Sequence, residues 1–244
     1  MSVLVLGATS RIAHELALRY GEAGQAVAVA ARDLEEALRI AADVRVRTTA
    51  PCEAFRFDAL AFETHEALVS AVAERLGEIE VAVLAFGDMG EQASSQSDFA
   101  AAHRVIDSNY TGCVSMCEHL VSGMLQQKRG AIVGITSVAG ERGRQSNYIY
   151  GSAKGAVTLY LQGLRNRLFK SGLTVTTIKL GFVDTRMTFG MKTGIPIASP
   201  EDASRAIFEA QARGADVVYY PWFWAGIMGI IRAIPEAAFK RLSL

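Results

Sequence analysis

Short runs of apolar residues alternate along the chain with segments whose apolar positions recur every three or four residues. The short runs lie at 3–6, 26–31, 55–57, 81–86, 131–136, 175–180 and 217–220. The helical segments between them lie near 12–20, 33–42, 63–76, 99–126, 150–170 and 202–212. Apolar strands that alternate with helices are typical of a parallel sheet covered on both faces. The pattern therefore predicts an α/β fold with its ligand at the carboxyl ends of the strands.

Length and composition favour one domain. The chain has 244 residues, half of them hydrophobic, which suits a single α/β core. No internal repeat, low-complexity tract or linker divides it, so we expect one Rossmann-like, doubly wound domain over 1–244. Lys+Arg and Asp+Glu balance at 25 each, so no overall field attracts nucleic acid.

The compartment is indicated by the start of the chain and by its cysteines. The opening Met-Ser-Val-Leu-Val-Leu-Gly predicts a strand and lacks the charged n-region of a signal peptide. Cys52, Cys113 and Cys117 are odd in number and match no zinc spacing, which favours a reducing compartment. We therefore expect a cytoplasmic protein, with Cys113 and Cys117 lining the core and no metal site.

A glycine turn follows the first apolar run, in the segment Gly7-Ala-Thr-Ser-Arg-Ile-Ala13. Gly7 permits a tight turn, and Thr9 and Ser10 can satisfy free amides at the start of the following helix. Such a helix end attracts a pyrophosphate. Arg11 stands where a complete dinucleotide fingerprint has glycine. A cation is unfavourable there unless an anion lies nearby, so we favour a phosphate contact, with a solvated Arg11 as the alternative.

The end of the second apolar run bears on cofactor choice. NAD-selective sites usually place an acidic residue there, about 20 residues past the glycine turn, to bind the ribose 2′-hydroxyl. This chain has Ala31 and then Arg32, which suits a 2′-phosphate. Asp33 is better interpreted as a helix N-cap, with Glu36 completing a capping box. The sequence favours NADP(H) over NAD(H).

The residues with the clearest chemistry are Tyr150 and Lys154, which lie four apart near the start of a predicted helix and so share one face. A phenol titrates near pH 10 and is a poor acid or base at neutral pH. A nearby ammonium group should lower that pKa. Ser137 lies upstream and can bond the same substrate oxygen. Because Tyr and Lys often occur four apart by chance, this pair acquires meaning only with the rest of the chain.

Together these residues resemble the short-chain dehydrogenase/reductase family over nearly the full chain. The resemblance implies a Tyr150–Lys154 motif with Ser137 thirteen residues earlier and Asn109 holding a relay water. It also places Asp58 beside the adenine ring and the segment at 180–185 near the nicotinamide amide. The implied cofactor contacts, beyond Tyr150 and Lys154, are Gly7, Thr9, Ser10, Arg11, Ile12, Arg32, Asp58, Ala85, Phe86, Gly87, Gly181, Val183 and Thr185.

Three departures from the family pattern are visible. The glycine turn is altered, Leu84-Ala-Phe-Gly87 replaces Asn-Asn-Ala-Gly, and Leu180 replaces the proline before Gly181. None removes a catalytic group. The Ala-Phe-Gly segment, Ala-Gly-Glu-Arg at 139–142 and an Ile-Pro near the C-terminus are similar to the branch of decaprenylphosphoryl-2-keto-erythro-pentose reductases.

The resemblance implies a mechanism. NADPH delivers hydride to a ketone carbon, Tyr150 protonates the developing alkoxide, and Ser137 donates a hydrogen bond to the same oxygen. Lys154 lowers the Tyr150 pKa and bonds the nicotinamide ribose, while Asn109 positions a water for proton return. Donors placed where charge develops should supply much of the acceleration.

Candidate substrate contacts follow Ser137 and Asp184. Arg142 and Arg144 could hold a phosphate through bidentate guanidinium bonds, or could be solvated or interface charges. The segment 184–199, which matches the family's mobile lid, contains Met187 and Met191, and thioether side chains suggest an apolar part to the ligand.

The C-terminal segment at 221–244 is apolar and then basic. The run from 217 to 231 is uncharged and too short to span a bilayer, and Arg232, Lys240 and Arg241 follow it. Trp222 and Trp224 could form an interfacial helix at the inner face of a membrane. The alternative is a segment packed on a second subunit or over the substrate cleft.

Three functions remain in competition. The leading hypothesis is an NADPH-dependent ketone reductase. Its carbonyl substrate could be a small molecule or a sugar linked to a lipid phosphate. The second is a reductase of another hydrophobic carbonyl, such as a steroid, acyl or small ketone. The third is a non-catalytic NADP(H) sensor, which the altered glycine turn leaves open. The family resemblance further implies a homodimer or homotetramer.

Overall fold

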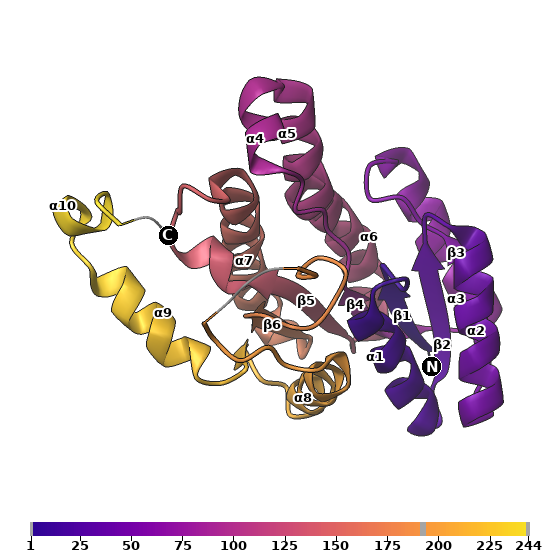
Figure 1. The fold of residues 1–244 in the computed structure, drawn as a ribbon. Helices are drawn as coiled ribbons and strands as arrows, with labels where there is room; N and C mark the ends of the chain where they lie inside the picture. The colour runs from indigo at the N-terminus through magenta and orange to yellow at the C-terminus, as the bar shows by residue number, and fades with distance from the viewer. Residues whose placement is uncertain (1, 191–193, 243–244) are drawn as a thin grey trace.

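The computed structural model describes residues 2–190 and 194–242, and in this part of the chain seven parallel strands form one sheet (Figure 1). The strand order is β3-β2-β1-β4-β5-β6-β7. The strands are β1 (Ser2–Leu6), β2 (Ala26–Ala31), β3 (Cys52–Arg56), β4 (Ile79–Leu84), β5 (Ala131–Ser137), β6 (Thr174–Leu180) and β7 (Val217–Tyr220). The predicted doubly wound parallel sheet is confirmed.

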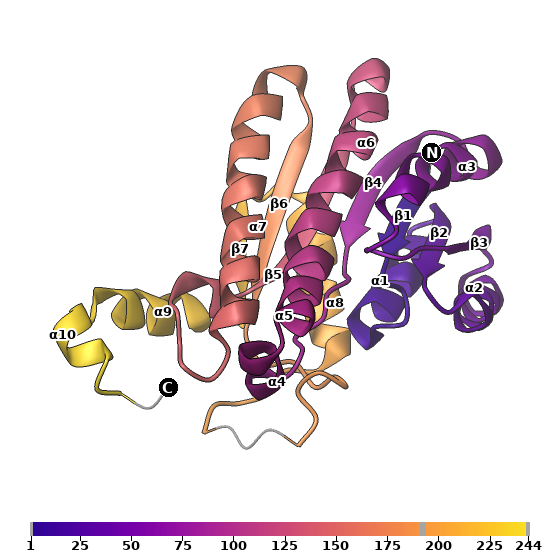
Figure 2. The ribbon, with the colours of Figure 1, turned by 90° about the horizontal axis from the view of Figure 1, so that it is seen from above.

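Helices cover both faces of the sheet (Figure 2). One face carries α1 (Arg11–Glu22), α2 (Leu34–Thr48) and α8 (Pro200–Ala212), and the other carries α3 (His65–Leu76), α6 (Gly112–Gln127) and α7 (Tyr148–Leu168). Because both faces are buried, the central strands are apolar at successive positions, as in Val3, Leu4 and Val5. Alternate residues of β1 therefore enter different cores.

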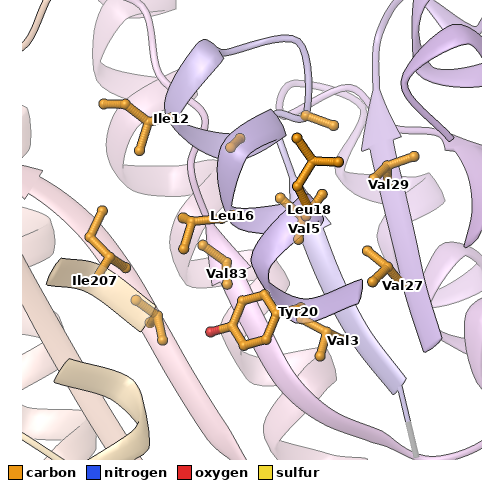
Figure 3. Close-up of a cluster of buried hydrophobic side chains, with 14 of the residues drawn as sticks. Val3, Val5, Ile12, Leu16, Leu18, Tyr20, Val27, Val29, Val83 and Ile207 are labelled. Carbon is orange, nitrogen blue, oxygen red and sulfur yellow. The ribbon is translucent and has the colours of Figure 1, made fainter. Parts of the chain in front are cut away.

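The core beside α1 fixes the start of the first helix (Figure 3). Val5, Leu16 and Ile207 are fully buried there, and the Tyr20 ring packs edge-on against Phe208 at a centroid separation of 5.1 Å. Each fully buried aliphatic side chain contributes about 1.5–3 kcal/mol. The packing holds α1 and α8 side by side, so the N-termini of these two helices lie near the same edge of the sheet.

The strand order reverses between β1 and β4, where a doubly wound sheet binds its ligand. Two segments meet at this switch point. Ala85 donates its N–H to the Leu6 carbonyl at 2.9 Å, and a Cβ added to Gly7 would lie 2.8 Å from the Phe86 nitrogen. The glycine turn after β1 therefore packs backbone to backbone against the segment that follows β4.

Most elements lie where the sequence predicts them, with two differences. The 99–126 segment is α5 (Phe99–Ile106) and α6, joined by a π-helical turn at Asp107–Thr111. A short helix, α4 (Gln92–Ser97), precedes it and was not predicted, because its sequence has no apolar residue other than one alanine and so no helical periodicity. Two helices, α9 (Trp224–Ala233) and α10 (Glu236–Phe239), follow β7. No helix within the described ranges is long and apolar enough to cross a bilayer.

Candidate active site

Tyr150 and Ser137 meet at the carboxyl end of β5. Ser137 is the last residue of that strand, and Tyr150 lies in the first turn of α7, where it is buried. The Ser137 side chain lies close enough to the Tyr150 phenol to act on its pKa, which it lowers against the larger effect of burial. The serine Oγ also accepts from the Ala139 amide at 3.1 Å, which fixes its rotamer. A hydroxyl and a phenol therefore converge as the sequence predicts.

Lys154 lies one turn further along α7 and is buried. Its Nζ donates to the Ile135 carbonyl at 3.2 Å and stands 5.9 Å from the centre of the Tyr150 ring. Burial lowers the pKa of Lys154 because the charged ammonium loses its hydration. The amine is thus held between β5 and α7, beside the phenol ring.

The structure corrects the expectation that Lys154 lowers the pKa of Tyr150. Burial raises the pKa of Tyr150 to about 12, and the neighbouring Ser137 side chain opposes that rise only in part. The reason is geometric, since the Lys154 ammonium is directed at the Ile135 carbonyl. Tyr150 is consequently a protonated phenol at neutral pH, which is the form that a proton donor requires.

Asn109 reaches the same place from the π-helical turn, and its side chain is fully buried. The Nδ2 group donates to the Asp88 carbonyl at 2.5 Å and to the Val105 carbonyl at 2.8 Å. A buried Oδ1 remains without a hydrogen-bond partner among the described residues. π-bulges are frequent at functional sites, and this one directs the amide inward. The orphan acceptor fits a water or ligand donor.

Gly87 explains why one glycine persists in the altered segment after β4. A Cβ at this position would collide with Asn109 Oδ1 and would lie 3.1 Å from Lys154 Nζ. The missing side chain therefore leaves room for the amide and the amine to converge. Ala85 and Phe86 line the same segment, and the Phe86 ring packs edge-on against Phe57 at 4.9 Å.

A contact between glycines fixes the distance between the Ser137 loop and α7. A Cβ on Gly140 would lie 2.5 Å from the Gly155 nitrogen and 2.6 Å from the Lys154 carbonyl carbon. Conversely, a Cβ on Gly155 would lie 2.8 Å from the Gly140 oxygen. The 3-10 turn Val138–Glu141 thus rests directly on the helix that carries Tyr150 and Lys154. The sequence analysis missed this contact, although the glycine after Lys154 was a visible signal.

The predicted phosphate-binding residues surround the start of α1. Gly7 has a φ of +83°, a backbone conformation that this tight turn requires and that glycine adopts without steric cost. Ser10 is the N-cap residue but its side chain makes no capping bond, so the predicted satisfaction of helix amides is wrong for Ser10. Ile12 is buried beneath the turn, and Thr9 is exposed beside it.

The arginines near this turn differ in their contacts. The Arg11 guanidinium pairs with Glu201 at the start of α8, at 2.7 Å, so its charge is met by protein. Arg32 is exposed just after β2, and Asp33 caps α2 by accepting from the Glu36 amide at 3.1 Å. The Glu36 side chain pairs with Arg39 at 2.8 Å, so the capping box is only half formed.

Asp58 follows β3 and the segment 181–185 follows β6, so both lie at the carboxyl edge of the sheet. Asp58 Oδ1 accepts from the Leu60 amide at 3.0 Å, and its carbonyl lies 2.9 Å from His65 Nε2. Val183 is buried and forms an isolated bridge with Ala198. The Thr185 amide donates to Thr188 Oγ1 at 3.1 Å.

Of the two methionines predicted to contact substrate, only Met187 lies within the described residues. Met187 Sδ lies 4.0 Å from the Tyr150 hydroxyl, so the start of the predicted lid reaches the phenol. Met191 lies outside the described residues. Met89 and Ile149, which the sequence analysis did not select, pack against the same cluster as Tyr150 and add apolar surface beside it.

The two candidate substrate arginines are not equivalent. Arg142 pairs with Glu236 at 2.7 Å and lies 4.2 Å from the centre of the Phe239 ring, so its guanidinium holds the C-terminal segment. Arg144 forms no ion pair with the described residues, and its buried Nε lacks a partner there. Burial lowers the pKa of Arg144. Only Arg144 therefore has a charge left for a ligand.

The parallel sheet and its helices bring Asn109, Ser137, Tyr150 and Lys154 together near the carboxyl ends of the strands. The chain belongs to the short chain dehydrogenase family, whose profile matches residues 1–194. This match spans both the glycine turn and the Tyr150–Lys154 helix.

Individual relatives agree. A Mycobacterium tuberculosis protein named as an uncharacterized oxidoreductase is 34% identical over 240 residues, covering 98% of this chain and 96% of its own. A Streptomyces coelicolor protein named as a ketoacyl reductase is 32% identical over 191 residues, covering 78% of this chain and 73% of its own.

A solved structure shares the architecture. A variant of actinorhodin polyketide ketoreductase, crystallised with NADPH, superposes with a TM-score of 0.80 at 26% identity, over 89% of this chain and 94% of the other. A short-chain dehydrogenase from Sphingobium yanoikuyae, in complex with NADPH, reaches a TM-score of 0.83 at 24% identity and 97% coverage of both chains. The second likeness concerns the fold alone.

Proposed function

We propose that this protein reduces a ketone to a secondary alcohol with NADPH. The observation that carries the proposal is the buried Tyr150 phenol, which lies beside Ser137 at the carboxyl end of β5. The structural relatives that hold NADPH support the cofactor. Asn109 supports a bound water or ligand beside these groups, because its buried Oδ1 is an acceptor without a partner among the described residues.

The protein's own groups then divide the work. NADPH, when bound, supplies the hydride. Tyr150 gives its proton to the developing alkoxide, and Ser137 donates a hydrogen bond to the same oxygen, where negative charge accumulates. Lys154 would bind the nicotinamide ribose, and Asn109 would hold the water that returns a proton to the amine. Gly181, Val183 and Thr185 would line the nicotinamide side, and Asp58 the adenine side.

The test is a panel of ketones assayed with NADPH by loss of absorbance at 340 nm. Steroid, acyl, small aliphatic and sugar-phosphate ketones separate the substrate hypotheses. We expect turnover with at least one class. If NADPH binds with no turnover across the panel, the protein is a nucleotide sensor and the reductase proposal is wrong.

Arg32 is expected to select NADPH over NADH. Replacing Arg32 by Ala should raise the KM for NADPH about tenfold or more, because a guanidinium bonded to a phosphate contributes roughly 1.5–3 kcal/mol, and should leave the KM for NADH within a factor of two. The measurement is the ratio of kcat/KM for the two cofactors. Arg39→Ala, in which a nearby exposed arginine paired with Glu36 is removed, is the control. An unchanged ratio in Arg32→Ala would assign the selectivity elsewhere.

The finer substrate proposal is a sugar ketone linked to a lipid phosphate. Arg144 supports the phosphate, since its charge is unpaired among the described residues, and Met187 with the predicted lid supports an apolar group. The resemblance to the decaprenylphosphoryl-keto-pentose reductases points the same way. Reduction of another hydrophobic carbonyl is the alternative.

Charge selectivity should therefore depend on Arg144. In Arg144→Gln, kcat/KM for a phosphorylated ketone should fall about tenfold or more, while its neutral counterpart changes less than threefold. In Arg142→Gln the ratio of the two substrates should stay constant, because Arg142 is already paired with Glu236. Equal losses for both substrates in Arg144→Gln would remove the phosphate contact.

A membrane contact through the C-terminal segment is part of the same proposal. On α9 and just before it, Trp222 and Ile230 are 81% and 71% exposed, whereas Trp224 and Met228 are buried. Arg232 and Lys240 follow. Such an apolar outer face with flanking cations suits the surface of an anionic bilayer.

Liposome co-sedimentation tests this contact. Trp222→Ala with Ile230→Ser should lower the fraction bound to vesicles containing anionic lipid at least threefold, because these side chains supply the exposed apolar area. The matched control is Phe99→Ser, which changes a 76% exposed aromatic residue on α5. Equal partitioning of the wild type, the double variant and Phe99→Ser would show that the membrane contact is wrong.

Assembly into a dimer or tetramer also belongs to the proposal. Leu159 on α7 and Phe169 just after it are 69% and 80% exposed, and the outer faces of α6 and α7 carry the Glu118–Arg167 ion pair. These features support a subunit interface along α6 and α7.

A further inference from the structure

A buried carboxylate ties the C-terminal segment to the loop that follows Ser137. Glu141 is 5% exposed, and its Oε1 accepts from Lys179 Nζ on β6 and from the Tyr219 hydroxyl on β7, each at 2.5 Å. Its Oε2 lies 3.4 Å from Arg232 Nε at the end of α9. Strands β6 and β7 and helix α9, all distant in the chain from Glu141, therefore meet at this residue, which lies four positions after Ser137.

A second contact lies at the other end of α9. Trp224 is 2% exposed and packs with Val138, the residue after Ser137. A Cβ on Gly181 would overlap the Trp224 indole, so the indole fills the space that a side chain would take at the end of β6. The same apolar cluster includes Ile195 from the lid segment. Trp224 thus contacts both the segment that follows β5 and the segment that follows β6.

A third contact secures α10. The Arg142 guanidinium pairs with Glu236 at 2.7 Å, stacks over the Phe239 ring, and donates to the Arg232 carbonyl at 3.3 Å. Residues 138, 141 and 142 therefore each have a partner in α9 or α10. Figure 2 shows these two helices lying beside the loop that precedes α7.

The buried charge of Glu141 makes the position of α9 against the Ser137 loop costly to change. A buried carboxylate is tolerated when donors surround it, and removing part of that environment leaves the remaining charges buried and unpaired. The Lys179 side chain is itself only 13% exposed, so water could hydrate its ammonium group only poorly if the carboxylate were removed. The position of the Ser137 loop is consequently coupled to the position of α9.

We propose that α9 and α10 form a clamp on the Ser137 loop, with Glu141 as the positioning residue that aligns Ser137 and Tyr150 for proton transfer. The inference rests on the proposed reductase function. Glu141 touches neither reacting group, and it acts through the turn Val138–Glu141, whose glycine rests on α7.

The test compares Glu141→Gln with the wild type, normalised to the number of NADPH-binding sites. We expect kcat per site to fall tenfold or more, the NADPH Kd to stay within threefold, and the primary isotope effect with deuterated NADPH to rise as hydride transfer becomes slower. The matched control is Glu53→Gln on β3, which removes a carboxylate paired with Arg75 far from the clamp. It should leave kcat per site unchanged.

Hydrogen exchange gives a readout that does not depend on turnover. Amides of 138–147 should exchange faster in Glu141→Gln, while those of α1 should not. If no ketone is reduced by the wild type, the function fails while this coupling can still be observed. An unchanged kcat per site with a lowered melting temperature would make Glu141 merely structural. Should Glu141→Gln not fold, Arg232→Gln must show the same losses in milder form, or the clamp is wrong.

Discussion

Replacing Tyr150 by Phe is expected to lower kcat by about 10²–10⁴-fold, the usual contribution of a positioned general acid. The substitution removes one hydroxyl from a buried ring and leaves its packing with Met89 and Ile149. NADPH affinity should stay within a few-fold, because the ring itself remains. Stopped-flow reduction and fluorescence titration of NADPH measure the two quantities separately. Near-normal turnover would remove Tyr150 from the mechanism.

The direction of the Tyr150 pKa shift adds a pH dependence to this prediction. Burial raises that pKa to about 12, so the phenol stays protonated through neutral and moderately basic pH. Ketone reduction needs this protonated form and should not lose rate through Tyr150 titration below about pH 10. Alcohol oxidation needs the phenolate and should accelerate with rising pH. The Tyr150→Phe variant should lose both rates and this pH dependence together.

The candidate catalytic residues could be selected from the sequence because their positions depend mainly on local periodicity. Tyr150 and Lys154 share a face of any helix that contains both, and Ser137 ends a strand that is apolar at successive positions. The parallel sheet follows from the alternation of strands and helices. The sequence therefore predicts that Tyr150 lies near Ser137, close enough for the serine to act on the Tyr150 pKa.

Other features depend on contacts that periodicity does not encode. The Glu141–Arg232 pair joins residues far apart in the chain. Arg142 was a candidate substrate contact because its pairing with Glu236 on α10 cannot be inferred from the sequence. The two tryptophans were treated alike, although Trp222 faces outward and Trp224 is buried. Burial also reversed the expected direction of the Tyr150 pKa shift. In each case the environment of a side chain decided the outcome.

Gly140 shows how a backbone contact sets the geometry of the catalytic group. Because a Cβ on Gly140 would lie 2.5 Å from the Gly155 nitrogen, Gly140→Ala must push the turn at 138–141 away from α7. Overpacking of this kind costs about 1–3 kcal/mol of folding free energy. We further expect kcat to fall about 10²-fold, because a displacement of about 1 Å between catalytic groups has that effect.

The same loop provides a matched control for this prediction. A Cβ on Gly143 would meet no atom within 4 Å, so Gly143→Ala should change neither kcat nor the free energy of unfolding appreciably. Urea denaturation and steady-state kinetics on both variants separate a general effect of alanine in the loop from the specific collision with α7. If Gly140→Ala retains wild-type kcat, the separation of Ser137 from Tyr150 is not set by the glycine contact. If it loses kcat while Gly143→Ala does not, the distance between β5 and α7 limits proton transfer.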